Sequence, residues 1–302
     1  AGTDVFHMLN GTQTNSPPWF KPTDFDVDFA FTRNTGASDD WPIGSRLTGQ
    51  SRMYTNYNIS ASDNGNFLWD YSRGWNGYTG SESGYQAWMF KRHTGMDVVT
   101  YEGDGVSGRQ IPHSLNKSPE MMWVKTRDSS GNDAGWQVYH KGLGPDDNDP
   151  EGWNLYLNTN QAQNWNNTGR WNATVPTSTH FTLGNYDGVN KDGDNYIAML
   201  FASVDGISSV GSYSGSDSEL TITTGFQPRL VIIKRISGSD PWFVLDTTRG
   251  WGSGSDQYLQ LQATDAQTGY DFGAPTSTGF TLVGNVDSFN DNGQNYIYYA
   301  HA

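Results

Sequence analysis

The chain carries the stretch Pro176-Thr-Ser-Thr-His-Phe-Thr-Leu183, and 99 positions later it repeats that stretch as Pro275-Thr-Ser-Thr-Gly-Phe-Thr-Leu282. Seven of the eight residues are identical. A polar loop follows each copy, and after it comes the same short motif, Asn195-Tyr-Ile197 or Asn295-Tyr-Ile297. Self-similarity at a fixed period indicates that one structural unit of about 100 residues occurs more than once.

The residues upstream of this stretch align in the same order. Met122-Trp-Val-Lys125 aligns with Val231-Ile-Ile-Lys234, and each is followed by a polar turn and a tryptophan, Trp136 or Trp242. A corresponding tryptophan, Trp41, stands near the start of the chain. Because these tryptophans keep their place in the repeat, we assign them to hydrophobic cores rather than to binding surfaces.

A weaker third copy opens the chain. Phe31-Thr-Arg33 resembles Lys125-Thr-Arg127, but the Pro-Thr-Ser-Thr element is missing. Terminal repeats are often divergent in this way. A unit of about 100 residues is large enough to bury a core of its own. We therefore predict three units, which span residues 1–95, 96–205 and 206–302.

The pattern within each unit is typical of an all-β fold. Arg229-Leu-Val-Ile-Ile-Lys234 is a continuous, partly β-branched run that suits a central strand. Trp242-Phe-Val-Leu-Asp246 alternates in part, as half-buried strands do. Such segments recur every ~10–15 residues between Gly, Asp, Asn and Ser, and no segment has sustained helical spacing. The sequence predicts tandem antiparallel β-sandwiches.

Charge and composition restrict the partners. The chain has 32 acidic and 18 basic residues, a net charge of −14, which repels nucleic-acid phosphates and anionic membranes. It has no cysteine, which excludes disulfides and thiolate metal sites and favours a bacterial or viral source. No apolar run approaches the ~18 residues of a membrane span. We expect neither nucleic acid nor a membrane as partner.

The order of motifs also resembles a known repeat family. The residues that carry the resemblance are Gly225-Phe-Gln-Pro-Arg-Leu-Val-Ile-Ile-Lys234, Thr248-Arg-Gly250, Ser277-Thr-Gly-Phe-Thr-Leu282 and Asn295-Tyr-Ile297. They resemble repeats in structural and fibre-like proteins of tailed phages, especially phages of aquatic bacteria. The resemblance covers 96–302 well and 1–95 poorly. It implies concanavalin A-like jelly-roll modules at an extracellular or virion surface, and it adds no catalytic residues.

Acidic residues gather in loops. Sandwich hydrolases carry Glu-x-Asp-x-x-Glu along one strand, and this string is absent. One loop offers hard oxygen ligands of the type that Ca²⁺ prefers, from Asp187, Asn190, Asp192 and Asp194. Turn formation explains the same residues, so a calcium site and a solvated turn both stay open. We expect no other cofactor.

Tryptophans that do not recur are candidates for carbohydrate binding. Trp153, Trp165 and Trp171 lie in or beside a stretch rich in Asn and Gln, and Trp251 follows a polar segment. Sugar rings stack on aromatic side chains, while amides and carboxylates bind the hydroxyl groups. Contacts between domains or subunits are an equal alternative, because tryptophan is enriched there as well.

These features favour a non-enzymatic structural subunit of a phage fibre, appendage or extracellular filament, with attachment to cell-surface polysaccharide. A secreted lectin-like protein and a polysaccharide depolymerase are the alternatives. Self-association is expected as well. The last unit ends on a strand, 296–300, and the first lacks a clear tyrosine strand before Pro22. A free edge in one subunit is expected to accept a strand from the next, in head-to-tail contacts.

Overall fold

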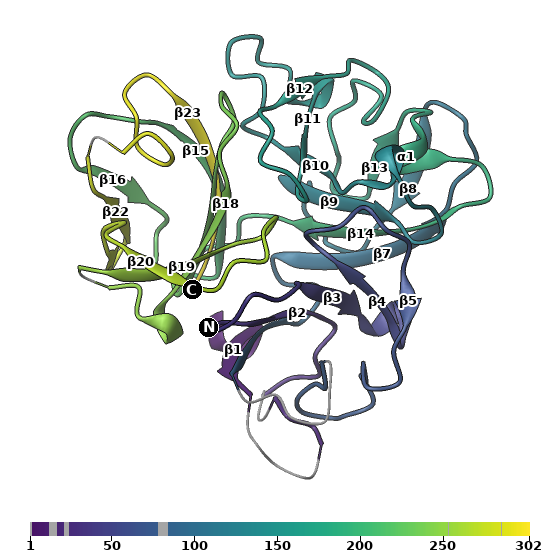
Figure 1. Cartoon of the computed structure of the whole chain (residues 1–302). Helices are drawn as coiled ribbons and strands as arrows, with labels where there is room; N and C mark the ends of the chain where they lie inside the picture. The colour runs from purple at the N-terminus through teal and green to yellow at the C-terminus, as the bar shows by residue number, and fades with distance from the viewer. Residues whose placement is uncertain (1, 12–16, 21–23, 78–83, 253, 285) are drawn as a thin grey trace.

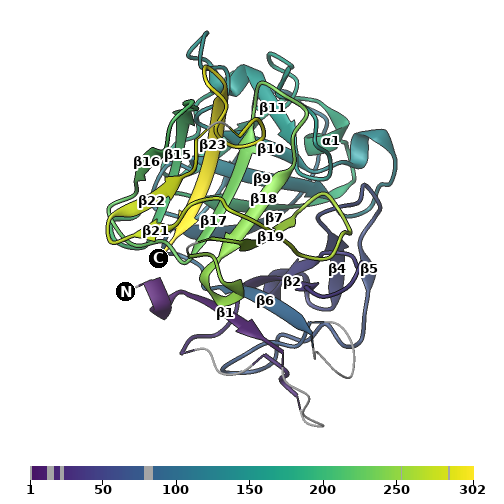
Figure 2. The same cartoon turned by 60° about the vertical axis from the view of Figure 1, so that its left-hand side comes forward.

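The computed structural model describes residues 2–11, 17–20, 24–77, 84–252, 254–284 and 286–302. Its described residues confirm an all-β protein built from antiparallel sheets, the main ones being three six-stranded sheets, one in each predicted unit. We call residues 1–95, 96–205 and 206–302 the first, second and third unit. Figure 1 shows them as three lobes around a common centre, and Figure 2 shows the third unit from the front.

The three six-stranded sheets share one strand order. In the first unit the order is β1 (Phe6–Asn10), β6 (Tyr85–Phe90), β2 (Phe29–Asn34), β3 (Pro42–Ser45), β4 (Ser51–Tyr54) and β5 (Ser62–Asp63). In the second it is β7 (Met96–Glu102), β14 (Asn195–Phe201), β9 (Met121–Thr126), β10 (Gln137–His140), β11 (Trp153–Tyr156) and β12 (Asn164–Trp165). In the third it is β15 (Ser208–Ser214), β23 (Asn295–His301), β17 (Leu230–Arg235), β18 (Trp242–Asp246), β19 (Asp256–Gln260) and β20 (Thr268–Tyr270).

A smaller sheet covers one face of the large sheet in the second and third units. It consists of β8 (Arg109–Pro112) and β13 (His180–Leu183) in the second, and of β16 (Leu220–Thr223), β22 (Gly279–Leu282) and β21 (Pro275–Thr276) in the third. The repeated Pro-Thr-Ser-Thr stretch leads into β13 and β22, so the repeat marks this second layer. In the first unit the described residues near Phe20, Leu68 and Trp75 make only single bridges.

Each large sheet buries both of its faces. Side chains alternate across a strand, so in β9 Val124 faces the second layer of its own unit while Trp123 faces the centre of the molecule. In β17, Ile233 faces the second layer of the third unit and Ile232 faces the centre of the molecule. Burial on both faces explains why these strands are continuous apolar runs rather than alternating ones.

The central core is common to all three units. Phe29 and Phe90 of the first unit meet Phe201 of the second, each with ring centroids 6.4 Å apart, and Phe201 meets Tyr299 of the third at 5.0 Å. Each unit also has a separate apolar cluster of its own. Each unit therefore buries a core of its own on one face of its large sheet, as expected, and on the other face it shares a core with the other two units.

The recurring tryptophans join the units into a closed ring. Trp41, Trp136 and Trp242 are buried, which confirms their assignment to the core. Each indole Nε1 donates to a carbonyl of another unit: Trp41 to Gln260 at 2.9 Å, Trp136 to Tyr54 at 2.7 Å, and Trp242 to Tyr156 at 2.9 Å. The first unit thus bonds to the third, the third to the second and the second to the first.

Three buried cations repeat this ring. Arg33 donates to the carbonyl of Thr264, Lys125 to that of Ile59 and Lys234 to that of Asn160. The strand register makes these cations equivalent, because Arg33, Lys125 and Lys234 face matching positions of β6, β14 and β23.

The sequence alignment of the first unit was wrong by two residues, since it matched Arg33 to Arg127. A shift of two residues keeps the strand face unchanged, so the apolar pattern could not detect it.

The expectation of an open edge at 296–300 is wrong. β23 pairs with β15 on one side and with β17 on the other, and β1 takes in the first unit the place that β7 takes in the second. Helical elements are short: α1 (Asp187–Asn190) and the 3-10 turns η1 (Gly2–Asp4), η2 (Arg46–Thr48), η3 (Asn132–Ala134), η4 (Pro150–Gly152) and η5 (Thr247–Arg249). Within the described ranges, none is long and apolar enough to cross a bilayer.

Candidate functional site

Two of the four candidate tryptophans form an accessible pair at the tip of the second unit. Trp153 and Trp165 are direct partners across β11 and β12, with ring centroids 5.3 Å apart and planes at 68°. Trp165 is 46% exposed, and Trp153 is partly buried beneath it. Gly152 makes room for this arrangement, since a Cβ atom there would clash with the Trp165 ring. The Trp165 ring is therefore accessible to a ligand.

The other two candidates are buried, which corrects their assignment to a sugar-binding surface. Trp171 is 1% exposed; its indole donates to the carbonyl of Trp153 at 3.1 Å. Trp251 is 2% exposed and packs against Phe280 in the core of the third unit. Neither ring can stack on a sugar, because stacking requires an accessible face.

A polar hollow of about 470 Å³ lies on the second unit. Its walls come from η3, the loop after β12 and the turn before α1, and they consist of Asp133, Asn166, Thr168, Gly169, Asn185, Tyr186 and Asp187. Asn166 follows Trp165 directly in the chain. Carboxylates, amides and hydroxyls together can donate to and accept from the hydroxyl groups of a neutral polar ligand.

Arg170 fixes one wall of the hollow from below. Arg170 is 3% exposed; its guanidinium lies 4.3 Å from the centre of the Tyr186 ring and donates from Nε to Gln137 Oε1 at 2.6 Å. Tyr186 in turn donates to Asp133 Oδ1 at 2.8 Å. Burial, followed by this hydrogen bond, raises the pKa of Tyr186, so the hydroxyl stays protonated and remains a donor.

The predicted calcium loop is a hydrogen-bonded turn. Asn190 is buried, accepts from the backbone N–H of Asp104 at 3.0 Å and donates to the carbonyl of Gly184 at 3.0 Å. Asp194 accepts from Ser129 and pairs with Lys191 at 3.4 Å.

Asp187 and Asp192 are exposed, and no three metal-type ligands converge within the described part of the chain. Asn290 makes equivalent bonds in the third unit, accepting from the N–H of Ser216 and donating to the carbonyl of Val283. The turn interpretation therefore explains why this asparagine recurs.

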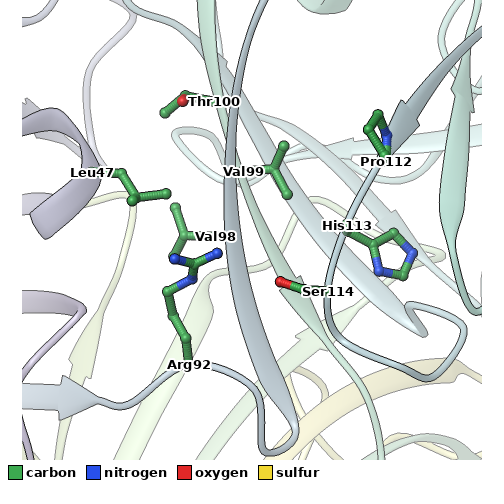
Figure 3. A pocket seen from close by; sticks show the side chains of 8 residues that line it. All are labelled: Leu47, Arg92, Val98, Val99, Thr100, Pro112, His113 and Ser114. Atoms are coloured by element: carbon green, nitrogen blue, oxygen red, sulfur yellow. The ribbon is translucent and has the colours of Figure 1, made fainter.

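A second hollow lies at the junction of the first two units (Figure 3) and measures about 320 Å³. Leu47 reaches it from the first unit, while His113 and Ser114 line it from the second. Buried Asp97 accepts from Arg92 Nε at 2.8 Å and from Ser114 Oγ at 3.0 Å. Ser114 Oγ also lies 3.3 Å from His93 Nδ1, but Asp97 bonds the serine itself and not the histidine, whereas in a catalytic triad the histidine lies between the two.

Sequence reasoning missed an aromatic hollow of about 210 Å³ on the third unit. Tyr258 and Tyr270 form its outer walls, and Phe272 and Phe289 lie at its base. Tyr270 is 47% exposed. Tyrosine and phenylalanine in a β-protein usually belong to the core, so nothing in the sequence distinguishes these rings from packing residues.

Comparison with known proteins gives a family without an assigned activity. A family model described as a domain of unknown function, DUF7483, matches residues 44–302. No curated protein matches the chain. The matched region starts within β3 and includes strands of all three units, so a single family model spans the ring. The chain belongs to the DUF7483 family.

Proposed function

We propose that the chain is a non-enzymatic structural subunit of a phage fibre, appendage or related extracellular filament, and that its surface loops bind cell-surface glycans. In this proposal its units are concanavalin A-like jelly rolls, and its location is extracellular or at the virion surface. The resemblance of 96–302 to phage repeats supports the location.

The closed ring supports the structural role. Bonds from buried donors such as Trp41, Trp136 and Trp242 connect the units in a cycle. Opening the ring would expose the apolar common core to water and break the hydrogen bonds between units, which costs free energy at every junction. A body of this kind suits a protein whose task is to hold its shape while its loops make contacts.

The observation that carries the glycan part is the exposed ring of Trp165, which lies on Trp153. An aromatic ring supported by a second ring keeps its orientation without a ligand. The polar hollow begins at the next residue, Asn166, and offers hydrogen-bonding groups to an adjoining part of the same glycan. The net charge of −14 favours neutral glycans over acidic ones.

A glycan array tests this directly. We expect saturable binding to a neutral glycan that Trp165→Ala weakens by about tenfold and Trp165→Phe largely retains. Val175→Ala is the matched control, because Val175 belongs to the same unit and is 63% exposed. If no neutral glycan binds, or if Trp165→Ala binds as well as the unchanged chain, the glycan part of the proposal fails.

Assembly is tested separately. The proposal includes self-association through strands at the sheet edges, such as β5 and β20. Sedimentation over a range of concentrations should show larger species. A secreted lectin-like protein would bind the same glycan but sediment as a monomer throughout, so this measurement separates the two.

Polysaccharide depolymerisation is the second candidate, and one observation favours it. Asp133 and Asp187 both line the polar hollow, and glycoside hydrolysis uses a pair of carboxyl groups. Release of reducing ends from a surface polysaccharide, abolished by Asp187→Asn, would replace our proposal. Under our proposal, neither the unchanged chain nor Asp187→Asn releases reducing ends.

A further inference from the structure

The aromatic hollow of the third unit has a construction unlike that of a glycan site. Phe272 stacks on Phe289 with centroids 4.2 Å apart, and Tyr270 stands edge-on to both rings, at 78° and 80°. Tyr258 lies 5.2 Å from Phe272. Polar side-chain groups are few, namely the two tyrosine hydroxyls and Ser288. Sugars need many hydrogen-bonding partners, and this hollow supplies mainly ring faces and edges.

The second unit shows what occupies the corresponding space. Strand register makes Gln137 of β10 equivalent to Phe243 of β18, and each lies beneath the loop that precedes the last strand of its unit. In the second unit, the guanidinium of Arg170 lies in this space and bonds to Gln137. It also lies 4.3 Å from the Tyr186 ring centre and 5.5 Å from that of Tyr156. The second unit therefore places a cation of its own against aromatic rings here.

The third unit has a different set of aromatic rings in this space, without a cation of its own. Within the part of the chain that the structure describes, no arginine or lysine lies over Phe243, Tyr258, Tyr270, Phe272 or Phe289. Aromatic rings attract cations through the negative potential of their faces, and cages of several rings favour quaternary ammonium groups.

Charge around the hollow agrees with a cationic occupant. The third unit has nine acidic and four basic residues. Asp271 adjoins Tyr270 and is exposed, and buried Asp256 accepts from the N–H of Phe272 at 2.8 Å. One basic side chain, Arg235, reaches the segment that carries Ser288 and Phe289, where it donates to the carbonyl of Asp287. The charge of Arg235 is balanced by Asp240 at 3.5 Å and by Asp291 at 3.6 Å.

We propose that the hollow between Tyr258, Tyr270, Phe272 and Phe289 binds a small quaternary ammonium compound of the choline type. The trimethylammonium group lies against the accessible rings of Tyr258 and Tyr270, above the buried base of Phe272 and Phe289, and supplies the positive charge that Arg170 supplies in the second unit. A volume of about 210 Å³ admits this group and the carbons next to it, and leaves no room for an oligosaccharide. The site does not rest on the proposed glycan function, because Trp165 and the polar hollow belong to another unit.

Ligand-observed NMR and calorimetric titration of the full chain with choline test the proposal. The comparison compound is 3,3-dimethyl-1-butanol, which has nearly the same shape without the charge. We expect choline to bind and the neutral compound to bind at least several-fold more weakly. Tyr270→Ala should weaken choline binding roughly threefold to thirtyfold, the range of a cation–π contact. Tyr270→Phe keeps the ring and should retain binding.

Tyr57→Ala is the matched control, since it removes another exposed tyrosine, 39% exposed, from the first unit. It should leave choline binding unchanged, and so should Trp165→Ala. Near-ultraviolet circular dichroism establishes that each variant is folded. Equal binding of the neutral compound would overturn the proposal, since the hollow would then be an apolar site without charge selectivity. Absence of choline binding, or full binding by folded Tyr270→Ala, would overturn it as well.

Discussion

Acid should weaken the contact between the second and third units through one buried histidine. His140 is fully buried, accepts from the N–H of Gly142 at Nδ1 (3.0 Å) and lies 3.3 Å through Nε2 from the carbonyl of Tyr298. These partners fit the neutral ring, with its proton on Nε2. Burial lowers the pKa of His140 to about 3, from an ordinary value of 6.5.

The sign and size of the effect follow from this pKa. Above pH 6.5 the ring is neutral in both the folded and the unfolded chain, so its stabilising contribution is fully present. Between pH 6.5 and about 3 only the unfolded chain takes up the proton, and the free energy of unfolding falls by about 1.4 kcal/mol per pH unit. At pH 4.5 the loss is roughly 3 kcal/mol, a large share of a typical ~5–15 kcal/mol.

Urea unfolding at pH 7.0 and pH 4.5 measures this loss. His140→Gln keeps a donor and an acceptor in a similar place but does not titrate. Between pH 7.0 and pH 4.5, the variant should therefore lose about 3 kcal/mol less free energy of unfolding than the unchanged chain. His180→Gln, at a more exposed histidine of the same unit, is the control and should keep the full dependence. An unchanged pH dependence in His140→Gln would refute the reasoning.

Three further outcomes are expected. Trp136→Phe removes the donor to the carbonyl of Tyr54 and should lower the free energy of unfolding by about 1–3 kcal/mol, measured by urea denaturation, whereas Trp165→Phe should change it little. Burial lowers the pKa of Lys234 to about 7 and that of Lys125 to about 8, so stability should rise as pH increases from 7 to about 10.5, and in pH-dependent melting curves Lys234→Met should reduce this rise to the part that Lys125 contributes. Addition of calcium or of a chelator should leave the melting temperature unchanged, because Asn190 is engaged within the turn; Asn190→Ala should nevertheless lower that temperature by several degrees.

The sequence predicted the strands within each unit, but not how the three units pack against one another. The Pro-Thr-Ser-Thr repeat and the apolar runs indicated strands in the right places, because strand pattern and turn residues are local properties. The continuous apolar run at 229–234 also suited a central strand. It could not indicate that one face is covered by the other two units, since that depends on how three sheets of distant sequence meet.

The candidate sites were less predictable for a similar reason. Trp165 and Trp171 lie six residues apart in the same polar stretch, yet one is 46% exposed and the other 1%. Local composition is the same for both, and the difference comes from tertiary contacts: Trp165 lies on the edge strand β12, whereas Trp171 packs against Tyr139. Tyr270 was missed because an exposed aromatic wall and a packed aromatic residue have the same sequence signature until the tertiary contacts are known.

Because the three units share one core and are bonded in a closed ring, we expect them to unfold together. Differential scanning calorimetry of the full chain should show one transition whose calorimetric and van't Hoff enthalpies agree. Two or three separable transitions, each with the enthalpy of a unit of about 100 residues, ~60–80 kcal/mol, would contradict it, because the units would then be stable without their shared centre.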